Sequence, residues 1–295
     1  MDVSSLAEIC ILRWDGYILI SPPLSIELLL MSSNRLIYFL VLSLTLATSN
    51  NVNAKTLRLA VASNFVETAQ QLSIIFTEQT GQSIQISSGS SGKLFLQISN
   101  GAPFDLFLSA DSHKPSELVK NGLALANSQQ TYAIGKLMLW LRDCSDTVSL
   151  LSLASQRVRK IAIANPKLAP YGYASQKLLE NHNLWNKLSG KLIYPENIAQ
   201  AAQFAKLRVI DAAIIAQSNA KRLRNNGESS VKSCLTELKT SDYSSITQQL
   251  VIISNSKNKG LAIEFIRFLS SDKAKNLINN MGYLLPNSGK IVPLS

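Results

Sequence analysis

Residues 57–111 twice run an apolar, strand-like segment into a hydroxyl-rich turn and then a helix-like segment, before a third strand ends the stretch. Ser63 and Asn64 follow the first strand, and Ser90 and Ser91 follow the second. The start of a helix offers unpaired N–H groups and the positive end of a dipole, and nearby hydroxyls add further donors. Such a junction holds a tetrahedral anion without a counter-charge. The pattern therefore predicts an α/β protein that binds an oxyanion.

The first 54 residues have the pattern of a targeting region. Residues 31–35 form a short positive segment, residues 36–46 form an apolar stretch too short to span a bilayer, and Val52-Asn53-Ala54 is a small-x-small cleavage site. We therefore predict a cleaved signal peptide over residues 31–54. Residues 1–30 then have no role, and we expect translation to begin at Met31.

A retained membrane anchor over residues 17–48 is the alternative, but Pro22, Pro23 and Glu27 interrupt that stretch. No cysteine follows the apolar segment, which disfavours a lipid anchor at the junction. Export leaves Cys144 and Cys234 in an oxidising compartment, where we expect them to pair. These features predict a freely soluble periplasmic protein.

The chain without residues 1–54 is strongly basic. Two of the 29 basic and four of the 19 acidic residues lie in the removed segment, so the formal net charge becomes +12. This charge speeds the encounter with small anions, and it would also attract nucleic acid. The basic residues are scattered, however, and only residues 221–224 cluster, without interleaved aromatic residues. A solvated helix face explains that cluster better, so we expect no nucleic-acid partner.

Strands alternate with helices through most of the remaining chain, which is typical of α/β layers with a mostly parallel sheet. A long strand over residues 132–141 is expected to leave a first lobe, and a strand over residues 248–254 is expected to return to it. One closing helix is predicted over residues 260–280 from its 3.6-residue apolar period. We predict lobe 1 over residues 55–137 and 248–295, and lobe 2 over residues 138–247, with a ligand cleft between them.

Several segments resemble the periplasmic molybdate-binding proteins of molybdate ABC transporters. They are Ala62-Ser63-Asn64-Phe65, Ser90-Ser91-Gly92-Lys93-Leu94, the run from Gly101 to Asp111, Asn165-Pro166 with Ala169-Pro170-Tyr171-Gly172, and Pro195-Glu196-Asn197-Ile198. The resemblance covers the chain from Lys55 to Leu294, and the run from Gly101 to Asp111 is its most specific part. It implies a two-lobe periplasmic binding protein fold, type II-like, with the ligand cleft between the lobes.

The resemblance also implies a ligand set of hydroxyls and backbone amides. Ser63 and Asn64 are expected from the first turn, Ser91 from the second, the amide or the phenol of Tyr171, and the amide of Ile198. Some members place a ligand tyrosine where this chain has Ala216, and a small residue where it has Tyr171. The phenol is therefore expected to have moved from one turn to another.

The function implied is capture of molybdate, and also tungstate, for delivery to an inner-membrane ABC permease. We expect a monomer that is no enzyme, has no cofactor, and binds no metal other than the molybdate oxyanion. A sulfate receptor or a receptor for another tetrahedral oxyanion is the nearest alternative, and a two-lobe sensory module is a second. The signal peptide and the absence of a helix-turn-helix segment before Lys55 disfavour the sensory module.

Two chemical alternatives have less support. A hydrolase with Ser63 or Ser91 as nucleophile needs a base, but neither His113 nor His182 lies in the matched turns. Neither histidine has a cysteine or carboxylate at ligand spacing, so a metal site has little support. The segment around Ser91 lacks the first glycine and the magnesium-binding hydroxyl of a nucleotide-binding phosphate loop. Asp105 is expected to have a structural role, bonded to backbone or to a neighbouring turn.

Overall fold

The computed structural model describes residues 11–14, 17–20, 55–143, 148–225 and 234–286. The chain divides into two units, residues 1–53 and residues 54–295. In the first unit, β1 (Ile11–Trp14) and β2 (Tyr17–Ile20) pair as an antiparallel hairpin. The predicted signal peptide over residues 31–54 lies outside the described residues. Among the described helices, none combines the length and the hydropathy that a membrane span requires.

The first sheet of the second unit contains five strands in the order β4-β3-β5-β12-β6. Their bounds are β3 (Thr56–Ala62), β4 (Ser83–Gly89), β5 (Leu106–Leu108), β6 (Gln130–Gly135) and β12 (Ile246–Ile252). Alternate residues of β3 face opposite sides of the sheet, so both faces carry a hydrophobic core. Leu57, Leu59 and Val61 belong to one core, and Ala60 belongs to the other.

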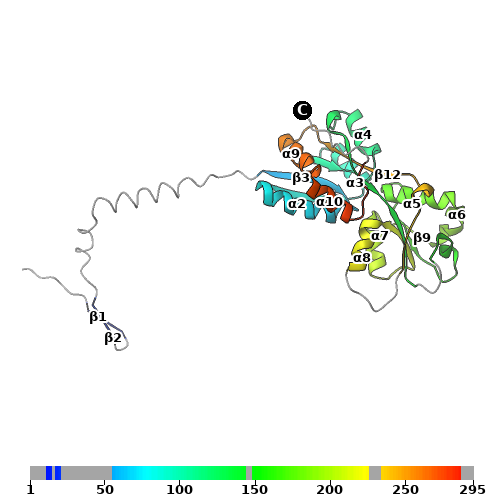
Figure 1. Ribbon diagram of the computed structural model, residues 1–295, viewed down its shortest axis with the longest axis horizontal. Coiled ribbons are helices and arrows are strands. Elements are labelled where there is room, and N and C mark those ends of the chain that lie inside the picture. Colours follow the sequence, from blue (N-terminus) through cyan, green and yellow to red (C-terminus); the bar gives the residue numbers. More distant parts are fainter. Residues whose placement is uncertain (1–10, 15–16, 21–54, 144–147, 226–233, 287–295) are drawn as a thin grey trace, which may run out of the picture. The chain divides into compact units, whose positions relative to one another are not determined.

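Helices cover both faces of this sheet (Figure 1). Residues of α2 (Val66–Thr80), α9 (Lys259–Leu269) and α10 (Asp272–Asn280) complete one core, and residues of α3 (Ser91–Ser99) and α4 (His113–Lys120) complete the other. Because α2 and α3 each follow a parallel strand of this sheet, their N-termini lie at the edge where β3 and β4 end. This edge is where the candidate site forms.

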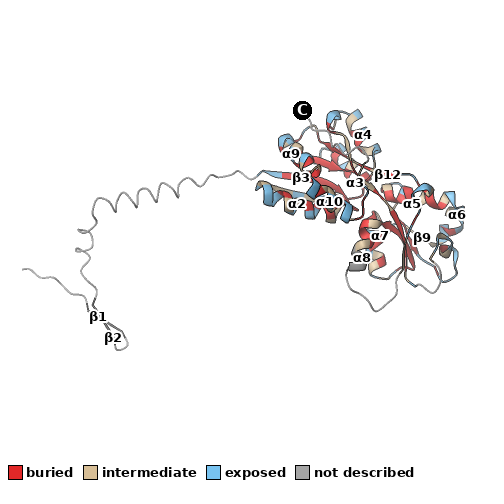
Figure 2. Cartoon of the chain, in the orientation of Figure 1, coloured by how far each residue is buried: buried red, intermediate tan, exposed pale blue. Residues whose placement is uncertain are grey.

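The second sheet contains five strands in the order β11-β7-β10-β8-β9. Their bounds are β7 (Leu137–Leu141), β8 (Ile161–Ala162), β9 (Leu192–Ile193), β10 (Ala212–Ala216) and β11 (Cys234–Glu237). Four helices accompany them, α5 (Pro170–Asn181), α6 (Trp185–Leu188), α7 (Ile198–Lys206) and α8 (Gln217–Asn225). Every residue of β7 and β10 is buried, as expected for central strands covered on both faces (Figure 2). Short 3-10 turns span Ala126–Ser128, Leu150–Ala154, Ser189–Lys191 and Thr240–Asp242.

Three local predictions were wrong. The strand expected over residues 132–141 is two strands, because the chain leaves β6 at Gly135 and enters β7 of the other sheet at Leu137. The helix expected over residues 260–280 is α9 and α10, because Ser271 accepts the backbone N–H of Ala274 and starts a new helix. Each sheet has two parallel and two antiparallel pairings between its described strands, so neither is mostly parallel.

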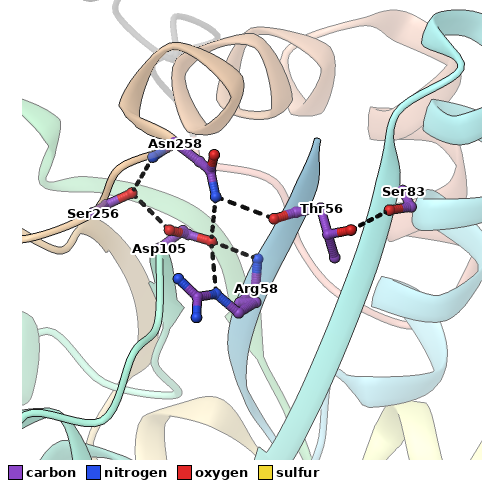
Figure 3. Close-up of polar contacts among 6 residues, drawn as sticks. All are labelled: Thr56, Arg58, Ser83, Asp105, Ser256 and Asn258. Atoms are coloured by element: carbon purple, nitrogen blue, oxygen red, sulfur yellow. Dashed lines mark hydrogen bonds and ion pairs between the residues drawn. The ribbon is translucent and has the colours of Figure 1, made fainter. Parts of the chain in front are cut away.

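Asp105 lies immediately before β5, fully buried, at the end of the first sheet where β3 begins. Its carboxylate accepts from the Arg58 backbone N–H at 2.8 Å, Ser256 Oγ at 2.8 Å and Asn258 Nδ2 at 3.2 Å, and Arg58 Nε lies at 3.4 Å (Figure 3). Nearby, the hydroxyls of Thr56 and Ser83 hydrogen-bond across β3 and β4 at 2.7 Å. Asp105 therefore ties three segments of the first lobe together, which is the structural role expected from the sequence.

Candidate functional site

The five residues predicted to bind a ligand line one cavity between the two sheets. They are Ser63 and Asn64 from the turn after β3, Ser91 at the start of α3, Tyr171 in the first turn of α5, and Ile198 at the start of α7. All five are buried, and none is more than 6% exposed. Two sheets therefore bring together segments that lie more than one hundred residues apart in the chain.

The cavity is small and uncharged. Its volume is about 10 Å³, which is room for about one water molecule. Ala62, Gly89, Ser90, Ala110, Ala169 and Pro170 complete the lining, which contains no acidic, basic or histidine side chain. The donors that this lining offers to a ligand are therefore neutral.

Five backbone N–H groups of the lining residues are available as donors. They belong to Asn64, Ser90, Ser91, Tyr171 and Ile198, and none of them donates to an acceptor in the part of the chain that the structure describes. Three lie in the first turn of α3, α5 or α7, where a helix has no internal acceptor for its N–H groups. The local positive potential at these helix starts favours a negative ligand.

The two predicted serines have different surroundings. Ser91 Oγ accepts the backbone N–H of Ala110 at 2.9 Å, so its own hydrogen remains free to be donated. Ser63 Oγ has no hydrogen-bond partner among the described residues, and α2 begins without a side-chain cap. Ser63 is therefore not a helix cap. Ser90 fills that role for α3, since its hydroxyl accepts the backbone N–H of Lys93 at 3.3 Å.

A buried polar network holds Asn64 in place. Its Nδ2 donates to Gln248 Oε1 at 2.8 Å and to Tyr283 OH at 3.2 Å. Its backbone carbonyl accepts from Tyr283 OH at 2.6 Å and from Ser218 Oγ at 3.1 Å. The side-chain donor of Asn64 is therefore already engaged, which leaves its backbone N–H as the group available to a ligand.

The phenol of Tyr171 points into the same network. Its hydroxyl lies 3.5 Å from Asn64 Nδ2 and 3.4 Å from Gln248 Nε2. The hydroxyl also occupies the position that a Cβ atom at Gly135 would take. Burial, together with the nearby Tyr283 and other tyrosines, raises the pKa of Tyr171 well above its usual value, so the hydroxyl stays neutral.

Sequence reasoning missed the supporting residues of this network, Gln248, Tyr283 and Ser218. Gln248 is fully buried in β12, where Thr247 and Gln249 flank it, so its polarity alone does not distinguish it from its neighbours in the sequence. Tyr283 follows α10, and Ser218 follows β10. The residues next to them in the sequence do not indicate that these two side chains lie close together in the fold.

Two further observations limit the chemistry of the site. Across the described ranges, no group of three or more His, Cys, Asp or Glu side chains could hold a metal ion.

A wider cleft of about 400 Å³ adjoins the cavity and shares Ala110, Ala169 and Pro170 with it. This cleft is lined mainly by half-buried and exposed side chains, including the ion pair between Asp111 and Lys114. It is therefore a poorer candidate for a desolvated binding site.

Comparison with known proteins gives four concordant similarities. Residues 57–284 match a family of bacterial extracellular solute-binding proteins. The chain is 31% identical to the molybdate-binding protein ModA of Rhodobacter capsulatus, covering 76% of this chain and 86% of that protein. It is 32% identical to ModA of Azotobacter vinelandii, covering 78% and 90%. The solved structure of the periplasmic molybdate-binding protein of Azotobacter vinelandii superposes with a TM-score of 0.73 at 34% identity, covering 78% of this chain and all of that one.

These similarities agree with the observed architecture. The prediction of a two-lobe α/β periplasmic binding protein fold is confirmed by the two sheets and by this structural match. The family resemblance stated from the sequence is confirmed as well.

Proposed function

The chain belongs to the bacterial extracellular solute-binding proteins, where its relatives include molybdate-binding proteins, and from that premise we propose that it captures molybdate in the periplasm. It delivers the anion, and tungstate as well, to an inner-membrane ABC permease. The protein works as a monomer, exported by a cleaved signal peptide, and it binds its ligand without a catalytic step.

One observation carries this proposal. Five N–H groups with no acceptor among the described residues, three of them in the first turn of a helix, belong to residues that line a buried cavity without any charged side chain. A dianion is stabilised there by dipoles and hydroxyls, which hold it firmly yet allow release, because no opposite charge has to be separated from it. The lining offers no carboxylate that could accept the proton of a phosphate.

The ligand set draws on both lobes. Ser63, Asn64 and Ser91 come from the first, and Tyr171 and Ile198 come from the second. The lobes must therefore part to admit the anion and close to complete its shell. The closed form, stabilised by the bound ligand, is the form that the permease recognises.

Calorimetric titration of the protein without residues 1–54 tests the proposal, with molybdate, tungstate, sulfate and phosphate as ligands. We expect molybdate and tungstate to bind within about tenfold of each other, because they are nearly equal in size. Sulfate should bind weaker by several orders of magnitude, because a smaller anion leaves donors buried without partners, at about 1–3 kcal/mol each.

The other outcomes are informative. Equal binding of sulfate and molybdate would make this protein a general receptor for tetrahedral oxyanions. Preferential binding of phosphate would contradict the role assigned to the neutral lining. Absence of binding for all four anions would overturn the proposed function.

A further inference from the structure

Two neighbouring residues of α3 have different tasks at the cavity. Ser91 lines it, and Gly92 makes a hydrogen bond to the other lobe, where its backbone N–H donates to the Leu168 carbonyl at 2.9 Å. Leu168 lies three residues before Tyr171, which also lines the cavity. This bond therefore joins the two lobes directly beside the proposed donors.

The contact depends on the missing side chain of Gly92. A Cβ atom there would lie 2.8 Å from the Leu168 carbonyl oxygen and 3.2 Å from the Leu168 Cα. Both are backbone atoms, which cannot rotate away as the end of a side chain can. Gly92 does not have a positive φ angle, so the close approach, and not the backbone conformation, is what requires glycine here.

A second contact between the lobes lies next to the first. Lys93 Nζ and Glu196 Oε2 are 3.2 Å apart, with side chains 52% and 33% exposed. An ion pair this exposed contributes little to the free energy of the closed form. Of the two contacts, the one at Gly92 is made by backbone atoms, which cannot move aside as the Lys93 and Glu196 side chains can.

We propose that Gly92 is a positioning residue that sets the closed separation of the two lobes, and thereby the affinity for the bound oxyanion. This inference rests on the proposed function. A side chain at position 92 would keep α3 apart from the segment before α5. The donors of one lobe would then lie too far from an anion that is bound to the other lobe.

The test compares Gly92→Ala with Gly190→Ala, a matched control because a Cβ at Gly190 would have nothing within 4 Å and its φ angle is ordinary. For Gly92→Ala we expect molybdate to bind about ten- to a hundredfold more weakly, through faster dissociation measured by stopped-flow fluorescence. The melting temperature without ligand should stay equal or rise, because alanine is the better helix former. Gly190→Ala should bind like the wild type.

Hydrogen exchange on the wild-type protein gives an independent measurement. The Gly92 amide should become more protected when molybdate is added, because its acceptor lies on the other lobe. The inference would be overturned if Gly92→Ala bound molybdate with wild-type affinity, or if the exchange rate of the Gly92 amide did not change on addition of molybdate. Either result would leave the proposed function intact. A loss of affinity accompanied by an equal loss of unliganded stability would assign Gly92 a purely structural role. Failure of the wild type to bind any oxyanion would overturn the proposed function itself.

Discussion

Ser63 and Ser91 line the same cavity, but their hydroxyls differ in what they do before a ligand arrives. Ser63 Oγ has no partner among the described residues, whereas Ser91 Oγ accepts the Ala110 N–H. Removing the first hydroxyl therefore takes away only a potential ligand donor. Removing the second also leaves a buried N–H group without an acceptor.

We therefore predict different consequences for the two alanine variants. Ser63→Ala should weaken molybdate binding about ten- to a hundredfold and leave the unliganded free energy of unfolding unchanged, because a hydrogen bond to a charged group contributes about 1.5–3 kcal/mol. Ser91→Ala should weaken binding similarly and also lower the free energy of unfolding by about 1–3 kcal/mol. Calorimetry and urea unfolding measure the two quantities. Unchanged affinity in both variants would remove these serines from the site.

The role of Tyr171 can be separated into its amide and its phenol. The phenol is directed toward Asn64, Gln248 and Gly135, whereas the backbone N–H is unpaired. We predict that Tyr171→Phe changes the molybdate affinity by less than about threefold and lowers the free energy of unfolding by about 1 kcal/mol, because Gln248 Nε2 loses its acceptor. Calorimetry of this variant beside Ser63→Ala gives the comparison. A tenfold or greater loss of affinity would mean that the phenol itself reaches the anion.

At the scale of helices and strands, local patterns predicted the site better than the crossings between lobes. Ser63, Ser91 and Ile198 each lie at a strand end or helix start, and such positions are visible in the order of apolar and polar residues. The break at Gly135–Leu137 has only Gly135 and Lys136 as a local sign, and what separates the two flanking strands is that their partners lie in different sheets. Likewise, the contact between Gly92 and Leu168 joins residues 76 positions apart, and no local pattern encodes it.

The pairing of β7 and β11 bears on the predicted disulfide. Cys234 is disulfide-bonded, and it lies opposite Leu141 in the sheet. Cys144, its expected partner, lies outside the described residues, three positions beyond Leu141. We predict that the two form a bond that ties the start of β11 to the end of β7.

The bond should stabilise the second lobe. It closes a loop of about 90 residues, for which the chain-entropy model gives roughly 4 kcal/mol, less any strain. Cys144→Ser with Cys234→Ser should lower the free energy of urea unfolding by about 2–4 kcal/mol. Mass spectrometry of the unreduced protein checks the pairing itself. Two free thiols, or a bond from Cys234 to Cys10, would contradict the prediction.

For the whole molecule, the polar network behind the cavity makes stability depend on alkaline pH. Tyr132, Tyr171 and Tyr283 are almost fully buried, and burial is the main cause that raises the pKa of each hydroxyl above its usual value. They come from β6, α5 and the segment after α10, so they join both lobes to the C-terminal part of the described chain. Their ionisation requires that this junction open.

We predict that the free energy of unfolding falls as the pH rises above about 10. In that range the unfolded chain releases its tyrosine protons, at a pKa of about 10, whereas the folded chain still holds them. The unfolded state then binds fewer protons, so the contribution of these tyrosines is complete below pH 10 and is lost as the pH rises toward their folded pKa. The quantity to measure is the difference between wild type and Tyr171→Phe in urea unfolding at pH 8 to 11, because the contributions of all other groups are common to both. The variant should lose stability less steeply, and parallel profiles would show that Tyr171 is not held in the neutral form by the fold.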